Sequence, residues 1–323
     1  MDTSAFELAA RAHERRVRPL HRDRTRVLMY HGLVESKIDP YLERNFHTLD
    51  EFRAHLRHLR HHRVIPADHA SLGKYGRSGL TVSITFDDGY HNNLIAADLL
   101  HDAKLPWSIF ISTGVIGTSS TIWTAQLGLL LLHGHSNAVD VLGRRWPLAN
   151  RAQRLEAFGA IRRAAKALVR VDRLRLLQDL TDQFASGELE RLLESFPSFR
   201  MLDWSSVRSL NSSGVTIGSH GVDHEILHDR QPPSVVRAEI DGSIGAIERE
   251  LGVRCISLAF PNGDCSADSC EIARLRGIRS AFTTVDGSVP TDGDRLALPR
   301  IDAPGDRMEF VRALIRGQGA KLH

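Results

Sequence analysis

Cysteine is scarce in this chain, and long apolar runs are missing. The three cysteines, Cys255, Cys265 and Cys270, are too few for a disulfide framework, and their spacing matches no zinc motif. We therefore expect free thiols in a reducing compartment. Residues 1–27 lack the apolar core of a signal peptide. The longest apolar run, at residues 127–134, is far shorter than the ~20 residues that span a membrane. Together these absences predict a cytoplasmic protein.

A strong excess of one charge sign is also absent, since the net charge is only +3. Basic residues gather in three stretches: residues 11–26, 53–63 and 161–175. Around the second, Phe52, Leu56 and Leu59 recur at helical spacing, so its basic residues form the outer face of an amphipathic helix. The alternative is an anionic partner, either a phosphate-bearing substrate or a membrane surface. Nucleic acid is disfavoured because no recognised motif and no interleaved aromatic residues accompany the charge.

Strand-like and helix-like segments alternate along most of the chain. Apolar strand patterns occupy residues 25–33, 80–86, 106–113, 215–219, 255–260 and 280–285. Helical patterns occupy residues 49–63, 91–105, 233–252 and 268–278, the first of them preceded by Thr48 as a candidate N-cap. Repeated β–α units with apolar strands predict an α/β fold with a parallel sheet covered by helices, either a barrel or a doubly wound layer.

One long segment breaks this alternation. Residues 116–200 have an almost entirely helical pattern, in which an apolar stripe runs between arginines. The stripe consists of Leu155, Phe158, Ile161, Leu168, Leu176, Leu177 and Leu180. We interpret the segment as a helical insertion between two β–α units. It either shapes a substrate cleft or serves only as a packing appendage.

Polar residues that could take part in catalysis or metal binding follow the predicted strands. His31 follows the first strand, Asp87 and Asp88 follow the second, and His220 and His224 follow a later one. In parallel α/β folds the carboxyl ends of the strands form the functional face. We therefore expect these side chains to lie close together.

Two histidines and one carboxylate suit zinc or another divalent cation and leave open positions for water and substrate. Such a site accounts for the adjacent aspartates, which would otherwise repel each other. One of them would ligate the cation, and its neighbour would act as general base on a water.

Three short motifs resemble those of the polysaccharide deacetylases, the family 4 carbohydrate esterases. "TFDDG" at residues 85–89 resembles their first motif, and "SHGVDH" at residues 219–224 resembles their second. "FPNG" at residues 260–263 is similar to the third, and "VLMYHG" resembles the opening strand of many members. The likeness covers roughly residues 26–304 apart from the insertion. We expect one catalytic domain over residues 1–323 that carries the insertion at residues 116–200.

The resemblance implies a distorted (β/α) barrel of about seven parallel strands and metal-dependent removal of an N- or O-acyl group. It implies that Asp87 is the catalytic base and that the metal ligands are Asp88, His220 and His224. It also implies that the backbone N–H of Asn262 contributes to an oxyanion hole. Zinc is the first choice of metal, with nickel, cobalt, manganese or iron as alternatives.

The later motifs depart from the family pattern. Gly221 stands where the family has serine or threonine, and Ala259 stands where it has an arginine that orients the base. Arg300 aligns with the histidine that acts as general acid, and its pKa is too high for that role. Arg300 would instead replace the lost arginine beside Asp87. The proton for the leaving amine would then come from His31, from His220 or back from Asp87.

Three functions fit these residues. The leading one is deacetylation of an amino sugar or saccharide intermediate, and its substrate would be an acetylated sugar, either free or linked to a phosphate or a lipid. The second is a non-sugar amidase or deformylase on the same barrel. The third is a catalytically inactive, metal-holding binding protein, which the missing arginine and histidine suggest and which the retention of both aspartates disfavours.

Overall fold

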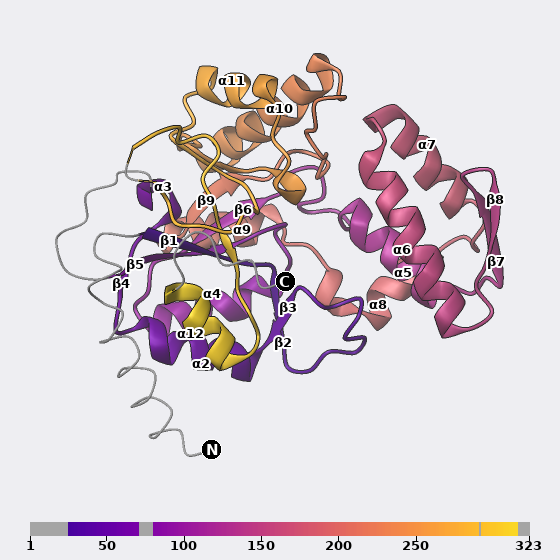
Figure 1. Ribbon diagram of the computed structural model, residues 1–323, viewed down its shortest axis with the longest axis horizontal. Coiled ribbons are helices and arrows are strands. Elements are labelled where there is room, and N and C mark those ends of the chain that lie inside the picture. The colour runs from indigo at the N-terminus through magenta and orange to yellow at the C-terminus, as the bar shows by residue number, and fades with distance from the viewer. Residues whose placement is uncertain (1–24, 71–79, 291, 316–323) are drawn as a thin grey trace.

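A parallel sheet forms the centre of the molecule, as the computed structural model of residues 25–70, 80–290 and 292–315 shows (Figure 1). Seven strands follow one another in the order β11-β10-β9-β6-β5-β1-β12, and β4 pairs with β5. Their bounds are β1 Thr25–Tyr30, β4 Arg63–Val64, β5 Thr81–Phe86, β6 Ser108–Ile111, β9 Thr216–Ser219, β10 Ser257–Ala259, β11 Ser280–Phe282 and β12 Ile301–Asp302. All of these pairings are parallel. The predicted distorted (β/α) barrel is confirmed, in the form of a half-barrel.

Helices cover both sides of this sheet. Figure 1 shows α2, α4 and α12 on one side and α10 and α11 on the other. The helices that belong to the β–α units are α2 Leu49–Leu59, α3 Ala67–Ala70, α4 Asn93–Asp102, α9 Trp204–Ser212, α10 Pro233–Leu251, α11 Ala267–Leu275 and α12 Arg307–Ile315. Every residue of β1, β5 and β6 is buried. Burial on both faces fits the apolar runs in β1 and β6, whereas in β5 the small polar residues Thr81, Ser83 and Thr85 alternate with apolar ones and are buried as well.

The chain leaves the sheet after β6 and returns at β9, which pairs directly with β6. The elements between them are α5 Trp123–His133, β7 Ala138–Val141, β8 Arg144–Pro147, α6 Arg151–Ala167, α7 Arg170–Thr181, α8 Glu188–Ser195 and the 3₁₀ turn η2 Pro197–Phe199, followed by α9. Apart from α9, which lies beside the central sheet, these elements extend to one end of the molecule in Figure 1. Phe158, Ile161, Leu176 and Leu180 of the expected apolar stripe lie in a hydrophobic cluster of this part of the chain. The expectation of an almost entirely helical segment was wrong at β7 and β8, which form an antiparallel hairpin.

A second, two-stranded sheet lies beside the barrel, where β2 (Gly32–Val34) pairs in parallel with β3 (Phe46–Thr48). The loop between these strands carries residues 35–45 towards the same end of the main sheet as His31. Across the described residues, no helix combines the length and apolarity needed to cross a membrane.

Helix α2 begins where the sequence predicts and ends earlier. Thr48 caps it in a capping box with Glu51, in which each side chain accepts a hydrogen bond from the other residue's backbone N–H. The helix stops at Leu59, and Arg63 starts the short strand β4 instead of continuing the helix. The N-terminal basic stretch lies outside the described residues up to residue 24, and Arg26 is buried within β1.

One basic residue of α2 does not lie on its outer face. Phe52, Leu56 and Leu59 point into the core as predicted, but so does His55, which is fully buried. Its ring stacks on Phe310 at a centroid distance of 3.8 Å, and its Nδ1 lies 3.0 Å from the Tyr30 hydroxyl. Burial lowers the pKa of His55 to about 3, because the charged imidazolium would lose its hydration.

We predict that His55 makes the fold acid-sensitive. Below the ordinary histidine pKa of about 6.5, the unfolded chain binds a proton at His55 that the folded chain does not bind until about pH 3, so stability falls as the pH falls through this window. The loss between pH 7 and pH 5 should be on the order of 1–2 kcal/mol. Urea unfolding at the two pH values measures it. His55→Gln, which cannot ionise, should show a smaller difference between pH 7 and pH 5, and an equal difference would contradict the assignment.

Candidate active site

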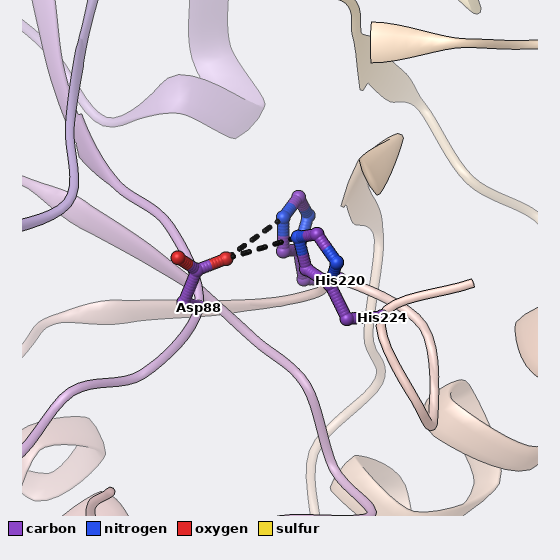
Figure 2. Close-up of side chains that lie close together, drawn as sticks. All are labelled: Asp88, His220 and His224. Carbon is purple, nitrogen blue, oxygen red and sulfur yellow. Dashed lines mark ion pairs between the residues drawn. The ribbon is translucent and has the colours of Figure 1, made fainter. Parts of the chain in front are cut away.

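Three side chains from two strand ends converge at the carboxyl edge of the sheet. Oδ1 of Asp88 lies 3.3 Å from Nε2 of His220 and 3.3 Å from Nε2 of His224. Figure 2 shows both imidazoles facing the same carboxylate oxygen. All three residues are buried, and among the described residues they form the group of ligand-type side chains suited to a metal ion.

The donor set fits a divalent cation. Two atoms that each lie ~2 Å from one ion at tetrahedral angles are about 3.3 Å apart, which matches both contacts of Asp88. Oδ1 of Asp88 is buried and has no hydrogen-bond partner in the described structure. Nδ1 of His220 lies 2.7 Å from the carbonyl oxygen of Ala259, to which it donates, so the Nε2 lone pair is left for a ligand bond. A cation at this position would give Oδ1 of Asp88 the partner that it lacks.

Asp87 points to a different partner from its neighbour. Arg300 donates from Nη1 to Oδ1 of Asp87 at 2.7 Å and from Nη2 to Oδ2 at 2.6 Å. Its Nε donates to the carbonyl oxygen of Thr283 at 3.0 Å, and Nη1 also contacts the Thr85 hydroxyl at 3.3 Å. Arg300 is fully buried. Its guanidinium is therefore fixed in place, and it holds both oxygens of Asp87 in one orientation.

The two aspartates are both ionised despite their burial. Burial alone would raise the pKa of Asp87, but the Arg300 guanidinium, with smaller effects from His220 and His31, holds this pKa below its ordinary value. Burial alone would also raise the pKa of Asp88, but the imidazoles of His220 and His224 hold it well below the ordinary range. The carboxylates thus differ in partner and share the same charge state at neutral pH.

Left-handed backbone geometry occurs at three of the site residues. The φ angles of Asp88, His224 and Asn262 are 74°, 54° and 59°. Non-glycine residues rarely adopt this region, and such residues cluster at functional sites. At Asp88 the turn separates its carboxylate from that of Asp87, and at Asn262 it forms the Pro-Asn-Gly turn after β10.

The loop that carries both histidines is braced by Glu239 of α10. Oε2 of Glu239 accepts hydrogen bonds from the backbone N–H of Val222 at 2.8 Å and of Asp223 at 3.0 Å. Gly221 has a φ of 79°, and a Cβ there would lie 2.8 Å from the same Glu239 oxygen. The carboxylate of Glu239 therefore occupies the space of the side chain that glycine lacks. Sequence reasoning missed Glu239, because no local pattern connects it to a loop 16–17 residues earlier.

His31 and Asn262 lie at the same pocket as Asp87, Asp88 and the two histidines. His31 follows β1, and its carbonyl oxygen accepts a 2.8 Å hydrogen bond from the buried side chain of Asn93. Nδ1 of His31 is buried without a hydrogen-bond partner in the described residues. All seven residues selected from the sequence therefore lie at this site, six of them lining the pocket and Arg300 behind Asp87.

Another wall of the pocket comes from residues that the sequence did not mark as site residues, although Arg162 and Lys166 belong to the third basic stretch, for which an anionic partner was the alternative. The residues of this wall are Tyr41, Leu42, Arg44, Asn45 and Phe46 of the β2–β3 region, Thr124, Ala125, Phe158, Arg162 and Lys166 of α5 and α6, and Tyr90, Ile122 and Phe199. Phe158 belongs to the apolar stripe, which by itself indicates only a buried helix face. Its role at a pocket depends on where the helix packs, and no sequence pattern specifies that.

Helix α7 connects this wall to the loop of the two histidines. Arg173 forms two hydrogen bonds with Glu225, the residue after His224, and both side chains are almost completely buried. Glu225 also accepts a 2.7 Å hydrogen bond from Gln231. Trp123 of α5 donates from its indole Nε1 to the carbonyl oxygen of His224 at 2.9 Å. The position of His224 thus depends on contacts with α5 and α7.

We predict that Arg173→Leu destabilises the protein by about 3–5 kcal/mol, because it leaves the Glu225 charge buried and unpaired. Chemical unfolding measures the loss. Arg145→Leu is the matched control, since Arg145 pairs with Asp140 at 2.8 Å where both side chains are more than half exposed. It should change stability by less than about 1 kcal/mol. Equal effects of the two substitutions would contradict the importance of the buried pair.

Comparison with known proteins agrees with this geometry. A family model described as polysaccharide deacetylase matches residues 74–281. None of the curated proteins gives a significant match. Similar solved structures include the Streptococcus pyogenes deacetylase PplD in complex with acetate, with a TM-score of 0.57, 15% identity, and coverage of 92% of this chain and 100% of that chain.

IcaB from Ammonifex degensii has a TM-score of 0.56 and 18% identity, with coverage of 91% of this chain and 97% of that chain. A de-N-acetylase from Aggregatibacter actinomycetemcomitans has a TM-score of 0.52 and 15% identity, with coverage of 90% of this chain and 100% of that chain. At these identities the structural matches establish the fold alone. The family model covers well over half of the chain, and its match includes the first three motifs. The chain belongs to the polysaccharide deacetylase family.

Proposed function

We propose that this protein is a metal-dependent hydrolase that removes an N-acetyl group from an amino sugar or a saccharide intermediate. The observation that carries the proposal is the division between the adjacent aspartates. Asp88 faces two imidazoles, whereas Asp87 is held by Arg300 and faces the same pocket. A binding protein would need only the first arrangement, so the complete second one favours an enzyme.

Asp88, His220 and His224 would hold the cation. Zinc is the first choice for a site of two histidines and one carboxylate, and nickel, cobalt, manganese and iron accept similar ligands. When bound, the cation would polarise the acyl carbonyl and lower the pKa of a coordinated water. Residues of this chain would supply the general base, the oxyanion donor and the general acid.

Asp87 is the proposed general base. It is ionised at neutral pH, lines the pocket, and keeps one orientation because Arg300 bonds both of its oxygens. It would accept a proton from the attacking water as the new C–O bond forms. Arg300 acts here as a positioning residue, in place of the arginine that Ala259 replaces.

The backbone N–H of Asn262 is the proposed oxyanion donor. The turn that carries it has a left-handed residue at Asn262 followed by Gly263, and the Thr284 hydroxyl donates to the carbonyl oxygen of Asn262 at 3.1 Å. The Thr284 bond holds the Asn262–Gly263 peptide group. The Asn262 N–H belongs to the preceding peptide group, whose Pro261 carbonyl oxygen accepts a hydrogen bond from the backbone N–H of Asp264 at 3.4 Å. A backbone donor oriented in this way stabilises negative charge as it develops on the acyl oxygen.

His31 is the proposed general acid. His220 is less suited, because Nδ1 is bonded to Ala259 and Nε2 faces the cation position. His31 lines the pocket and has an unpartnered ring nitrogen. It would donate a proton to the leaving nitrogen as the C–N bond breaks, so that the products are a carboxylate and an amine.

We propose further that residues 1–323 form one catalytic domain and that residues 116–200 are an insertion that shapes the substrate cleft. Support comes from α6, whose residues Phe158, Arg162 and Lys166 line the same pocket as Asp87 and Asp88. Phe158 and Tyr41 are in edge contact at a centroid distance of 6.0 Å and present aromatic surface to the pocket. Sugar rings have apolar faces that suit such a surface.

The proposed division of labour predicts two distinct phenotypes. Asp87→Asn should retain metal and lose hydrolysis by about a hundredfold or more, because asparagine cannot accept the proton. Asp88→Ala and His224→Ala should lose metal as well as activity. The measurements are metal content by elemental analysis and acetate release from N-acetylated sugars, with and without chelator. Unchanged turnover in Asp87→Asn, or full metal content in Asp88→Ala, would refute these roles.

The role of His31 is testable through the leaving group. His31→Gln should reduce N-acetyl sugar hydrolysis by about a hundredfold, since an amine leaves poorly without a proton. Hydrolysis of an aryl acetate should fall much less, because a phenolate needs no proton to leave. His101→Gln, at an exposed position of α4, is the matched control. Equal losses on both substrates would mean that His31 has a structural role.

A panel that includes cyclic amides and formamides separates the sugar deacetylase from the amidase.

A further inference from the structure

Three cationic side chains that are exposed or partly exposed line the catalytic pocket. Arg44 comes from the loop before β3, and Arg162 and Lys166 come from adjacent turns of α6. All three line the same pocket as Asp88 and the two histidines. The cationic side chains therefore lie beside the reacting centre.

None of these three cations forms an ion pair within the described residues. Nε of Arg162 is buried without a hydrogen-bond partner. Lys166 donates from Nζ to the side-chain oxygen of Asn262, which is neutral. Burial and then the charge of Arg44 lower the pKa of Lys166, and Asp264 opposes them only in part. Apart from this partial effect of Asp264, the three like charges have no ion-pair partner among the described residues, so they would attract an anion.

Other arginines of the same part of the chain are paired with carboxylates. They include Arg144 with Glu156, Arg145 with Asp140, Arg151 with Asp39, Arg170 with Asp223, Arg173 with Glu225 and Arg191 with Glu188. The carboxylates inside the pocket are already engaged, since Asp87 binds Arg300 and Asp88 faces the metal ligands. Arg154, Arg163 and Arg200 of this part of the chain also have no ion pair among the described residues, but of the unpaired cations only Arg162 and Lys166 line the pocket, together with Arg44.

Both arginines of this group lie over an aromatic ring. The guanidinium carbon of Arg44 is 6.0 Å from the centroid of Tyr41, and that of Arg162 is 5.2 Å from the centroid of Phe158. Both distances lie within cation–π range, and this contact does not use the guanidinium N–H groups, which can still donate to a planar or tetrahedral oxyanion. A sugar on the Tyr41–Phe158 surface would have these N–H groups at its side.

We propose that the substrate is an N-acylated amino sugar that carries an anionic group, a phosphate ester or a carboxylate, and that this group binds between Arg44, Arg162 and Lys166. The proposal rests on the deacetylase function proposed above and adds its substrate class. Phosphate and carboxylate share the chemistry that a guanidinium recognises, so the experiment includes both.

The first test compares kcat/KM for acetate release from N-acetylglucosamine 1-phosphate, N-acetylmuramic acid and the neutral methyl glycoside of N-acetylglucosamine. The unaltered protein should prefer at least one anionic sugar by about tenfold or more, since a charged hydrogen bond contributes enough for such a factor. The double substitution Arg44→Gln, Arg162→Gln should remove that preference. Arg163→Gln, an exposed neighbour on α6, should keep it. Equal kcat/KM for neutral and anionic sugars overturns the substrate class and leaves the deacetylase function in place.

The second test measures binding without turnover, by calorimetry of the metal-loaded protein with glucose 1-phosphate and with methyl glucoside. Binding of the phosphate sugar that weakens by about tenfold or more in the double variant, with no weakening in Arg163→Gln, supports the anion site even if no acetyl sugar is hydrolysed. Binding that the double variant leaves unchanged places the anion on the metal and overturns the proposal. Thermal unfolding of each variant shows that the comparison is made on folded protein.

Discussion

Two adjacent carboxylates buried at the end of β5 are the constraint on which the rest of this structure depends. Asp87 and Asp88 are almost inaccessible to water, so each must be neutralised by a partner from elsewhere in the chain. The left-handed backbone at Asp88 sends the two side chains in different directions. Asp87 meets Arg300, which precedes β12, and Asp88 meets the histidines that follow β9. Because β12 pairs with β1 at the edge of the sheet, it also brings Arg300 next to Asp87.

The part of the chain between β6 and β9 contributes to this site in two ways. Its arginines hold the histidine loop from outside, through Arg170 to Asp223 and Glu239 and through Arg173 to Glu225. Its helix α6 lines the pocket from the other side with aromatic and cationic residues. One packed unit thus contacts the loop of His220 and His224 and lines the pocket in front of it. Residues of α6 and α7 share one hydrophobic cluster, so a substitution within that cluster would affect both.

Local sequence patterns predicted most helices and strands correctly, but they did not predict where some of them end or which residues they contact. Repeated β–α units indicated a parallel sheet, and Thr48 was expected as the N-cap of α2, whereas its capping box with Glu51 was not expected. The end of α2 was missed because Arg60 to Arg63 continue a helical composition while the pairing of β4 with β5 takes Arg63 into the sheet. His55 was assigned to the polar face by its residue type, yet it packs on Phe310 from the last helix. The hairpin of β7 and β8 was missed because its strands are short and rich in charge.

The sequence by itself determined the family, the parallel α/β architecture and the residues that meet at the strand ends, because these depend on short motifs and on the common direction of the strands. The tertiary structure decided which partner each aspartate has, which carboxylate braces the glycine-containing loop, and which cations remain unpaired at the pocket. Those outcomes join residues as distant as Asp87 and Arg300 or Lys166 and Asn262. They depend on how helices pack against the sheet, and packing distances are not encoded in any local pattern.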